Sequence, residues 1–274
     1  MLKRLNKRFL CFAILLVSSL MAANGIAATV AVKEVKPVTS VNNQNTPENI
    51  KALNLEPLNI AVASNFKVAA LDIARQFTKQ FAIEVHISSA STATLYQQII
   101  RGAPFDLFLS ADQKHVKLLV DANKTSQHLG FIYAQGRLVF WQPALNHQPT
   151  LDDFITYQDR LAIANPKFAP YGIAAQQALT FTEKWQSQPY VMGNNINQAF
   201  QFVDSKSVAA GLVSYAAVIQ KQQTHYVLIP LQWHQPITQY GVIINDQKSQ
   251  QAELFKQFLL SSTIQKQIAQ QGYN

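Results

Sequence analysis

The stretch that decides the fold is Ile87–Asp112, which reads ISSASTATLYQQIIRGAPFDLFLSAD. The alternating apolar residues of 83–87 predict a strand that leads into it, and the apolar spacing of 95–100 predicts a helix. A glycine and a proline then end the helix, and the apolar run 105–109 predicts a second strand. A strand, a helix and another strand in this order are typical of a parallel α/β sheet.

Hydroxyl side chains gather where the first of these strands gives way to the helix: Ser88, Ser89, Ser91, Thr92 and Thr94. The first backbone N–H groups of a helix have no partner inside it, and the helix dipole is positive at that end. Such a corner can bind an anion. The alternative is that the hydroxyls only cap the helix.

The chain repeats this arrangement at four strand-to-helix corners: Ser64-Asn65, Ser91-Thr92, Tyr171-Gly172 and Gly193–Ile196. In open α/β sheets ligands bind at the carboxyl ends of the strands, where these corners lie. None of the corners carries an acidic or basic residue at its tip. Neutral hydrogen-bond donors suit a fully ionised oxyanion, because they donate to its charged oxygens. Capped helix starts are, however, common in any α/β protein. We expect Ser64 or Asn65 to cap the helix predicted at 66–80, and Asp112 to cap the helix predicted at 113–122.

Residues 1–27 are typical of a secretory signal peptide, with a basic start, an apolar core over 9–20 and small residues at the end. We expect cleavage near Ala27 or Ala28. An uncleaved anchor is the alternative, but the apolar core is short for a membrane span. Residues 28–56 are rich in Asn, Gln and Pro without an apolar period, which predicts a flexible linker.

The composition of the exported chain excludes some kinds of site and argues against some kinds of partner. The only cysteine, Cys11, lies in the signal segment, so the mature chain can form no disulfide or thiolate metal site. The formal net charge falls from +8 to +4 when the four basic residues of 1–27 are removed. The remaining positive charge is spread thinly, which argues against a nucleic-acid partner. A mild positive field would help to attract a small anion.

Several motifs resemble the periplasmic molybdate-binding proteins of ABC importers: AVASNF (61–66), TLYQQI (94–99), GAPFDLFLSAD (102–112), GRLV (136–139), IANPK (163–167) and APYG (169–172). The resemblance covers residues 58–273, and the run 102–112 is its most specific part. It implies a binding protein for molybdate or tungstate that delivers the oxyanion to a membrane permease. It also implies no cofactor, no bound metal cation and a monomer.

The fold expected from this resemblance is a two-lobed α/β periplasmic binding protein of type II, in which each lobe is a mainly parallel sheet flanked by helices. The ligand would lie in the cleft between the lobes. We assign 57–134 and 245–274 to lobe I, and 135–244 to lobe II. The chain should cross between lobes around 131–139 and return around 236–244.

The resemblance also assigns ligand positions. The first hydroxyl falls on Ser64, followed by Asn65, and the second falls on Thr92, where the family usually has serine. Ser91 is therefore an alternative for the second hydroxyl. The third and fourth positions fall on Tyr171 and Ile196, each acting through its backbone N–H.

Some members of the family add a tyrosine hydroxyl just after the strand that matches 211–213. In this sequence Ser214 stands at that position and Tyr215 follows one residue later. Either residue is a candidate for an additional ligand, and the sequence does not choose between them.

Other functions remain as alternatives. A cleft of the same kind can bind sulfate or thiosulfate, whereas phosphate carries a proton near neutral pH and needs an acceptor that the corners lack. A ferric-ion site would need paired tyrosines and carboxylates. An enzyme would need a catalytic constellation, such as Asp106, Asp112 and His115 on a metal. The six histidines show no metal-ligand spacing, so we expect no enzyme.

Overall fold

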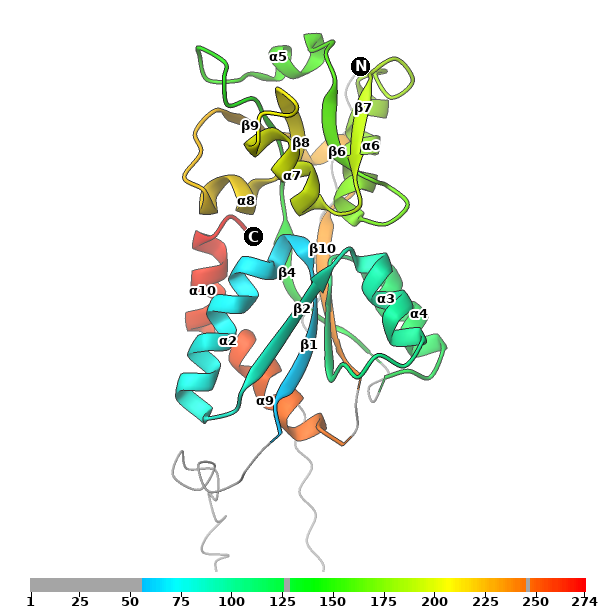
Figure 1. The fold of residues 1–274 in the computed structure, drawn as a ribbon, viewed down its shortest axis with the longest axis vertical. Helices are drawn as coiled ribbons and strands as arrows, with labels where there is room; N and C mark the ends of the chain where they lie inside the picture. Colours follow the sequence, from blue (N-terminus) through cyan, green and yellow to red (C-terminus); the bar gives the residue numbers. More distant parts are fainter. Residues whose placement is uncertain (1–55, 126–128, 245–246) are drawn as a thin grey trace, which may run out of the picture. The chain divides into compact units, whose positions relative to one another are not determined.

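The computed structural model describes residues 56–125, 129–244 and 247–274. The predicted signal peptide (1–27) and all of the predicted linker (28–56) except Glu56 lie outside the described residues. Within the described part of the chain, two five-stranded sheets account for all the strands (Figure 1). The prediction of an α/β protein built on two sheets is confirmed.

The first sheet has the strand order β2-β1-β3-β10-β4. Its strands are β1 (Leu58–Ala63), β2 (Val85–Ala90), β3 (Leu107–Ser110), β4 (Phe131–Gly136) and β10 (Ile237–Ile243). β10 runs antiparallel to both of its neighbours, β3 and β4, while β1 is parallel to β2 and β3. Around this sheet lie η1 (Ser64–Phe66), α2 (Lys67–Phe81), α3 (Thr92–Ile100), α4 (Gln113–Asp121), α9 (Ser249–Leu259) and α10 (Ser262–Gln270).

The second sheet has the order β7-β6-β8-β5-β9. Its strands are β5 (Leu138–Trp141), β6 (Leu161–Ala164), β7 (Tyr190–Gly193), β8 (Ala210–Ser214) and β9 (Tyr226–Leu228). β5 is antiparallel to β8 and β9, while β6 is parallel to β7 and β8. The accompanying helices are α5 (Leu151–Thr156), α6 (Pro170–Phe181), α7 (Ile196–Asp204), α8 (Tyr215–Gln220) and η2 (Leu231–Trp233).

The chain passes between the sheets twice. The first passage is at Arg137, between β4 and β5, and the second lies between β9 and β10. The first passage lies within the expected range of 131–139, whereas the second comes before most of the expected range of 236–244. The sheets divide the chain differently from the predicted boundaries, however, since β4 extends to Gly136 and all of β10 lies in the first sheet. The apolar run of β10 pairs with β3 and β4, which brings residues 237–243 out of the predicted lobe II.

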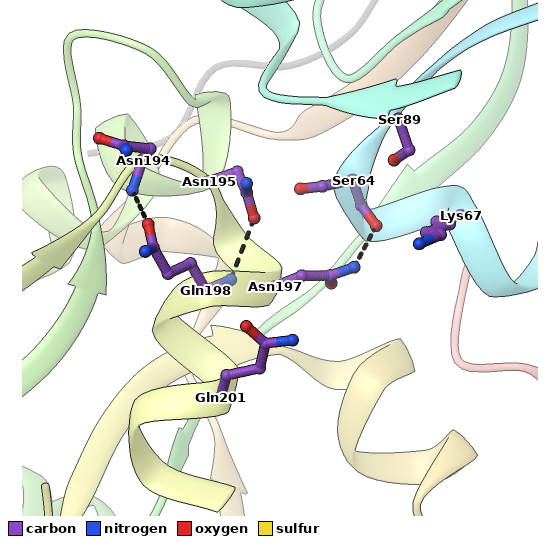
Figure 2. Close-up of a pocket in the computed structure, with 8 residues that line it drawn as sticks. All are labelled: Ser64, Lys67, Ser89, Asn194, Asn195, Asn197, Gln198 and Gln201. Carbon is purple, nitrogen blue, oxygen red and sulfur yellow. Dashed lines mark hydrogen bonds between the residues drawn. The ribbon is translucent and has the colours of Figure 1, made fainter. Parts of the chain in front are cut away.

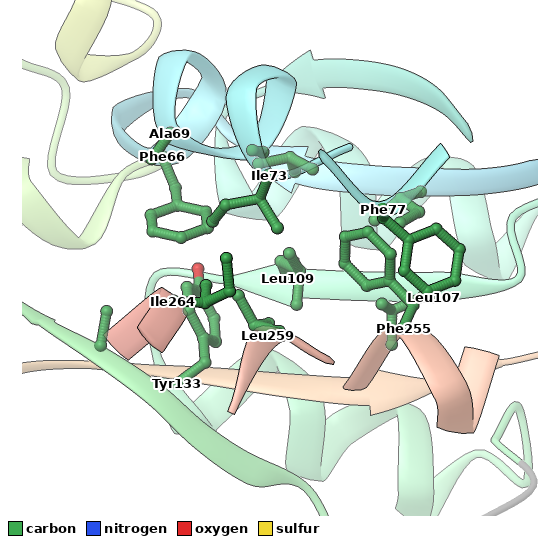
Figure 3. Close-up of a cluster of buried hydrophobic side chains, with 14 of the residues drawn as sticks. Phe66, Ala69, Ile73, Phe77, Leu107, Leu109, Tyr133, Phe255, Leu259 and Ile264 are labelled. Carbon is green, nitrogen blue, oxygen red and sulfur yellow. The ribbon is translucent and has the colours of Figure 1, made fainter. Parts of the chain in front are cut away.

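Alternation along the strands builds two apolar layers on the first sheet. Leu107 and Leu109 of β3 face the cluster under α2, α9 and α10, where Phe77 and Phe255 pack edge to face at 5.0 Å (Figure 3). Phe108 points the other way, into the cluster under α3 and α4. Each fully buried side chain of this size stabilises the fold by about 1.5–3 kcal/mol. These layers fix the strand ends that carry the corners.

The corners come together because their strands are neighbours. β1 and β2 end in register, Ala63 beside Ala90, and β6 and β7 end in register, Ala164 beside Gly193. The strand expected at 83–87 is displaced to Val85–Ala90. Its late start follows from Ala82, which ends α2 in the left-handed conformation with φ of 56°. Ser88 and Ser89 therefore lie within a strand and not at the helix entry.

Candidate functional site

At the first corner, Ser64 follows directly after β1 and is only 7% exposed. We expected Ser64 or Asn65 to cap the next helix, and this prediction is wrong: neither η1 nor α2 has a side-chain cap. The chain makes the short turn η1 before α2 begins, and the Asn65 amide donates to Gln239 at 2.9 Å instead. The usual structural use of a serine at a helix start therefore does not account for Ser64.

At the second corner, two neighbouring hydroxyls have different partners. Ser91 is the N-cap of α3, and its oxygen accepts the Thr94 backbone N–H at 3.3 Å. Thr92 is the first residue of the helix, and its hydroxyl oxygen accepts the Ala111 backbone N–H at 3.2 Å. The capping interpretation thus holds for Ser91. A hydroxyl that accepts one bond still has its own proton to donate, so Thr92 keeps a donor.

At the third and fourth corners the residues lie at helix starts. Tyr171 is the second residue of α6, which begins at Pro170 and has no side-chain cap. Ile196 is the first residue of α7, whose N-cap Asn195 accepts the Gln198 backbone N–H at 3.0 Å. Backbone N–H groups at these positions have no acceptor inside their own helix. Both corners can therefore offer donors without using a polar side chain.

A glycine allows α6 to start where it does. A Cβ at Gly172 would lie 2.5 Å from the Ala164 carbonyl oxygen, so only glycine lets the first turn of α6 rest on the end of β6. The motif at 169–172 therefore has a steric reason in addition to its resemblance to the family.

Hydrogen bonds connect the corners of one sheet with those of the other. The Asn197 amide donates to the Ser64 carbonyl at 2.7 Å (Figure 2), and the Ala93 backbone N–H donates to the Phe168 carbonyl at 3.2 Å. The first bond joins the Ser64 corner to the start of α7, and the second joins the Thr92 corner to the loop before α6. The exposed fractions are 1% for Thr92, 1% for Tyr171 and 2% for Ile196, so each corner is shielded from solvent.

The two candidates for an additional ligand are engaged elsewhere. Ser214 is fully buried and caps α8, where its oxygen accepts the Ala217 backbone N–H at 3.3 Å. The Tyr215 backbone N–H donates to the Arg137 carbonyl at 2.9 Å, and its ring packs against Tyr226 at 5.4 Å. Neither contact leads to one of the four corners.

Sequence reasoning missed a buried polar network behind the first corner. The Gln239 side-chain oxygen accepts from the Asn65 amide and from the Tyr133 hydroxyl, each at 2.9 Å. The Tyr273 hydroxyl donates to the Asn65 carbonyl at 2.6 Å. The network holds Asn65 through both its side chain and its backbone, and so fixes the turn that carries Ser64. Its members come from distant segments, and no local pattern marks them.

Burial keeps the phenols of this region neutral. It raises the pKa values of Tyr133, Tyr171 and Tyr273. The Tyr171 hydroxyl is buried and has no hydrogen-bond partner among the described residues. It lies 2.0 Å from where a Cβ at Gly136 would be, so its position requires glycine at the end of β4. The environment is thus polar but carries no negative phenolate.

Two features of the described residues bear on other functions. In residues 56–125, 129–244 and 247–274, no group of three His, Cys, Asp or Glu side chains is arranged to hold a metal ion. The trio Asp106, Asp112 and His115, which served as the example of an enzyme's metal site, is not such a group: Asp112 caps α4 and contacts the His115 ring at 2.8 Å, whereas Asp106 accepts the Asn59 backbone N–H at 2.7 Å. Across the same ranges, no helix is long and apolar enough to span a membrane.

Comparison with known proteins adds independent information. The family of bacterial extracellular solute-binding proteins matches residues 58–274. The molybdate-binding protein ModA of Rhodobacter capsulatus is 32% identical over 78% of this chain and 86% of its own, and that of Azotobacter vinelandii is 35% identical over 70% and 79%. The solved structure of the Azotobacter vinelandii periplasmic molybdate-binding protein superposes with a TM-score of 0.74 at 29% identity, covering 79% of this chain and 98% of that one.

More distant structures share only the fold. The sulfate-binding protein SubI of Mycobacterium tuberculosis superposes with a TM-score of 0.64 at 12% identity, over 80% of this chain and 86% of that one. The matched family consists of binding proteins, which confirms that the chain is not an enzyme. The chain belongs to the bacterial extracellular solute-binding proteins and, within them, to the family of the molybdate-binding proteins.

Proposed function

We propose that this protein captures molybdate or tungstate outside the cytoplasm and delivers it to the membrane permease of an ABC importer. The observation that carries the proposal is the set of four neutral helix starts, linked across the two sheets by the Asn197–Ser64 and Ala93–Phe168 hydrogen bonds. The molybdate-binding relatives supply the identity of the anion.

The proposed ligands are two hydroxyls and two backbone donors. Ser64 and Thr92 donate through their side chains, while Tyr171 and Ile196 donate through their backbone N–H groups. Asn65 supports the Ser64 turn through its bonds to Gln239 and Tyr273. The Ser91 hydroxyl caps α3 and also contacts the Thr94 hydroxyl at 2.7 Å, and this second engagement favours Thr92 as the second hydroxyl ligand.

This donor set selects by charge and protonation. Molybdate and tungstate are fully ionised dianions near neutral pH, so each oxygen can accept hydrogen bonds. Hydrogen bonds to a charged group contribute about 1.5–3 kcal/mol each. A protonated phosphate would need an acceptor, and the four corners provide donors. Closure of the two lobes about the two crossing segments would complete the site, because only a bound anion satisfies both pairs of corners.

Size is the proposed basis for discrimination against sulfate, which remains the alternative ligand together with thiosulfate. Sulfate has the same charge as molybdate but shorter bonds. In a rigid closed site its oxygens would not reach all four donors, and each buried donor left unpaired costs about 1–3 kcal/mol. We expect sulfate to bind about tenfold to ten-thousandfold more weakly than molybdate.

Export is part of the proposal. Residues 1–27 would direct the chain to the periplasm and be removed near Ala27-Ala28, and residues 28–56 would form a flexible linker ahead of the folded lobes. Lobe I would comprise the first sheet with the C-terminal helices, and lobe II the second sheet. The protein would act as a monomer, since one chain carries all four corners.

A thermal-shift screen of the exported protein tests the ligand directly, because a ligand that binds the native state raises the melting temperature. The compounds are molybdate, tungstate, sulfate, phosphate and ferric citrate. We expect large shifts with molybdate and tungstate and a small one with sulfate. A large shift with sulfate and none with molybdate would overturn the ligand assignment.

A further inference from the structure

A polar pocket of about 360 Å³ lies beside the Ser64 corner (Figure 2). Its walls come from the starts of η1 and α2, from β2, and from the start of α7. Eight residues line it: Ser64, Lys67, Ser89, Asn194, Asn195, Asn197, Gln198 and Gln201. Each water occupies about 30 Å³ of liquid volume, so the pocket has room for a small anion together with several waters.

The lining has a simple chemistry. Lys67 carries the only charge among the eight described residues, and the others provide hydroxyls and carboxamides. The Ser89 hydroxyl oxygen is buried and has no hydrogen-bond partner in the described part of the chain. A pocket that holds one cation and many neutral donors, without a carboxylate, favours an anion.

The pocket shares one residue with the proposed oxyanion site and has exposed residues at its rim. Lys67, Asn194 and Gln201 are exposed at its rim, whereas Ser64 is only 7% exposed. Ser64 belongs both to this pocket and to the proposed site, and Asn195 immediately precedes the Ile196 donor. An anion in the pocket would therefore already contact one of its final ligands.

We propose that this pocket is an outer site that receives the hydrated, doubly charged tetrahedral oxyanion before it enters the four corners, and that Lys67 attracts it there. The inference rests on the proposed function. A single positive charge at the entrance raises the local concentration of a dianion and speeds its association. Because the charge stays outside the four corners, it acts on the association rate and not on the final hydrogen bonds.

The test measures association and dissociation rates separately, by rapid filtration of the periplasmic protein with radiolabelled molybdate. Lys67→Gln should lower the association rate constant about threefold at about 0.1 M salt, where charges interact over about 10 Å. Lys67→Glu should lower it about tenfold or more. Both differences should vanish near 1 M salt, and the dissociation rate constant should stay within twofold of the wild type.

Lys79→Gln is the matched control, because it removes the same charge from the last turn of the same helix. Its position lies twelve residues along α2, or about 18 Å at 1.5 Å per residue, and is screened at that salt concentration. The control should associate at the wild-type rate. An equal loss in both variants would show a general charge effect and overturn the outer site.

Two further results would also overturn the inference. A Lys67→Gln association rate equal to that of the wild type would show that the pocket does not attract the anion. A slower association that persists at 1 M salt, or a faster dissociation, would make Lys67 part of the final site. Failure of the proposed function is distinguishable, since the wild-type protein would then retain no molybdate at all.

Discussion

The two pairs of corners have the same geometry but different chemistry. In each pair, two parallel neighbouring strands end in register, Ala63 beside Ala90 and Ala164 beside Gly193. The first pair places hydroxyls at the helix starts, whereas the second pair has Tyr171 and Ile196, whose donors are backbone N–H groups. Two of the four proposed donors therefore depend on the identity of a side chain, and the other two depend only on where a helix begins.

The largest effect is expected at a backbone donor. Ile196→Pro removes the N–H, yet proline is well tolerated as the first residue of a helix, and the extended Asn195 before it suits an X-Pro bond. The loss of one hydrogen bond to a dianion, about 1.5–3 kcal/mol, should weaken molybdate binding about tenfold to a hundredfold or more in calorimetry.

The matched control for this variant is Ile196→Val, which keeps the N–H while shortening the buried side chain. It should bind molybdate within about threefold of the wild type, and its cost of about 0.5–1.5 kcal/mol should appear in stability. Equal affinity losses in the two variants would mean that packing, and not the backbone donor, matters at this corner.

The next effect concerns a side-chain donor. Ser64→Ala should weaken molybdate binding about tenfold to a hundredfold, since it removes one hydroxyl donor to a charged ligand. The melting temperature without ligand should hardly change, because Ser64 caps no helix. A variant with unchanged affinity but a lower melting temperature would reverse this assignment.

A smaller expected effect tells which of the two adjacent hydroxyls of the second corner, Ser91 or Thr92, binds the anion. Thr92→Ala should lower affinity about tenfold, whereas Ser91→Ala should leave affinity within threefold and reduce the free energy of unfolding by about 1 kcal/mol through the lost cap. Calorimetry and denaturant unfolding of both variants provide the comparison. The opposite pattern would make Ser91 the ligand.

The smallest expected effect is a pH dependence of the free energy of unfolding that comes from His234 and involves none of the four corners. Burial lowers the pKa of His234 most strongly, with Arg137 acting in the same direction and the bond from Nδ1 to the Gln235 carbonyl acting against it. Below about pH 6.5 the unfolded chain takes up a proton that the native His234 resists, so stability falls with falling pH. His234→Gln should flatten the unfolding free energy between pH 7.5 and about pH 5.5. A slope as steep as that of the wild type would assign the dependence to other groups.

The sequence predicted those features that local patterns determine. Alternating strands and helices and the Asp112 cap of α4 follow from short stretches, and the structure contains them. The cap at Ser64 or Asn65 was a wrong prediction, because the bond from Asn65 to Gln239 joins residues 174 positions apart. Long-range polar contacts of this kind leave no periodic signal.

In the candidate site, too, some features could be predicted from local sequence and others could not. The positions of Tyr171 and Ile196 could be predicted, since a helix start and its N–H groups follow from local sequence. The choice between Ser91 and Thr92 could not, because it depends on the Ala111 N–H, which comes from another strand-to-helix corner of the same sheet. The Lys67 pocket also required the fold, since three of its eight lining residues come from α7 and lie more than a hundred positions along the chain from Lys67.

The joint binding of the anion by all four corners is tested most directly by the anomalous scattering of tungsten, in crystals of the protein grown with equimolar tungstate. We expect one peak, with tungstate oxygens within about 3.2 Å of the Ser64 and Thr92 hydroxyls and of the Tyr171 and Ile196 backbone nitrogens. A peak bonded to only one pair of corners, or tungsten held by lysine or arginine side chains, would contradict it.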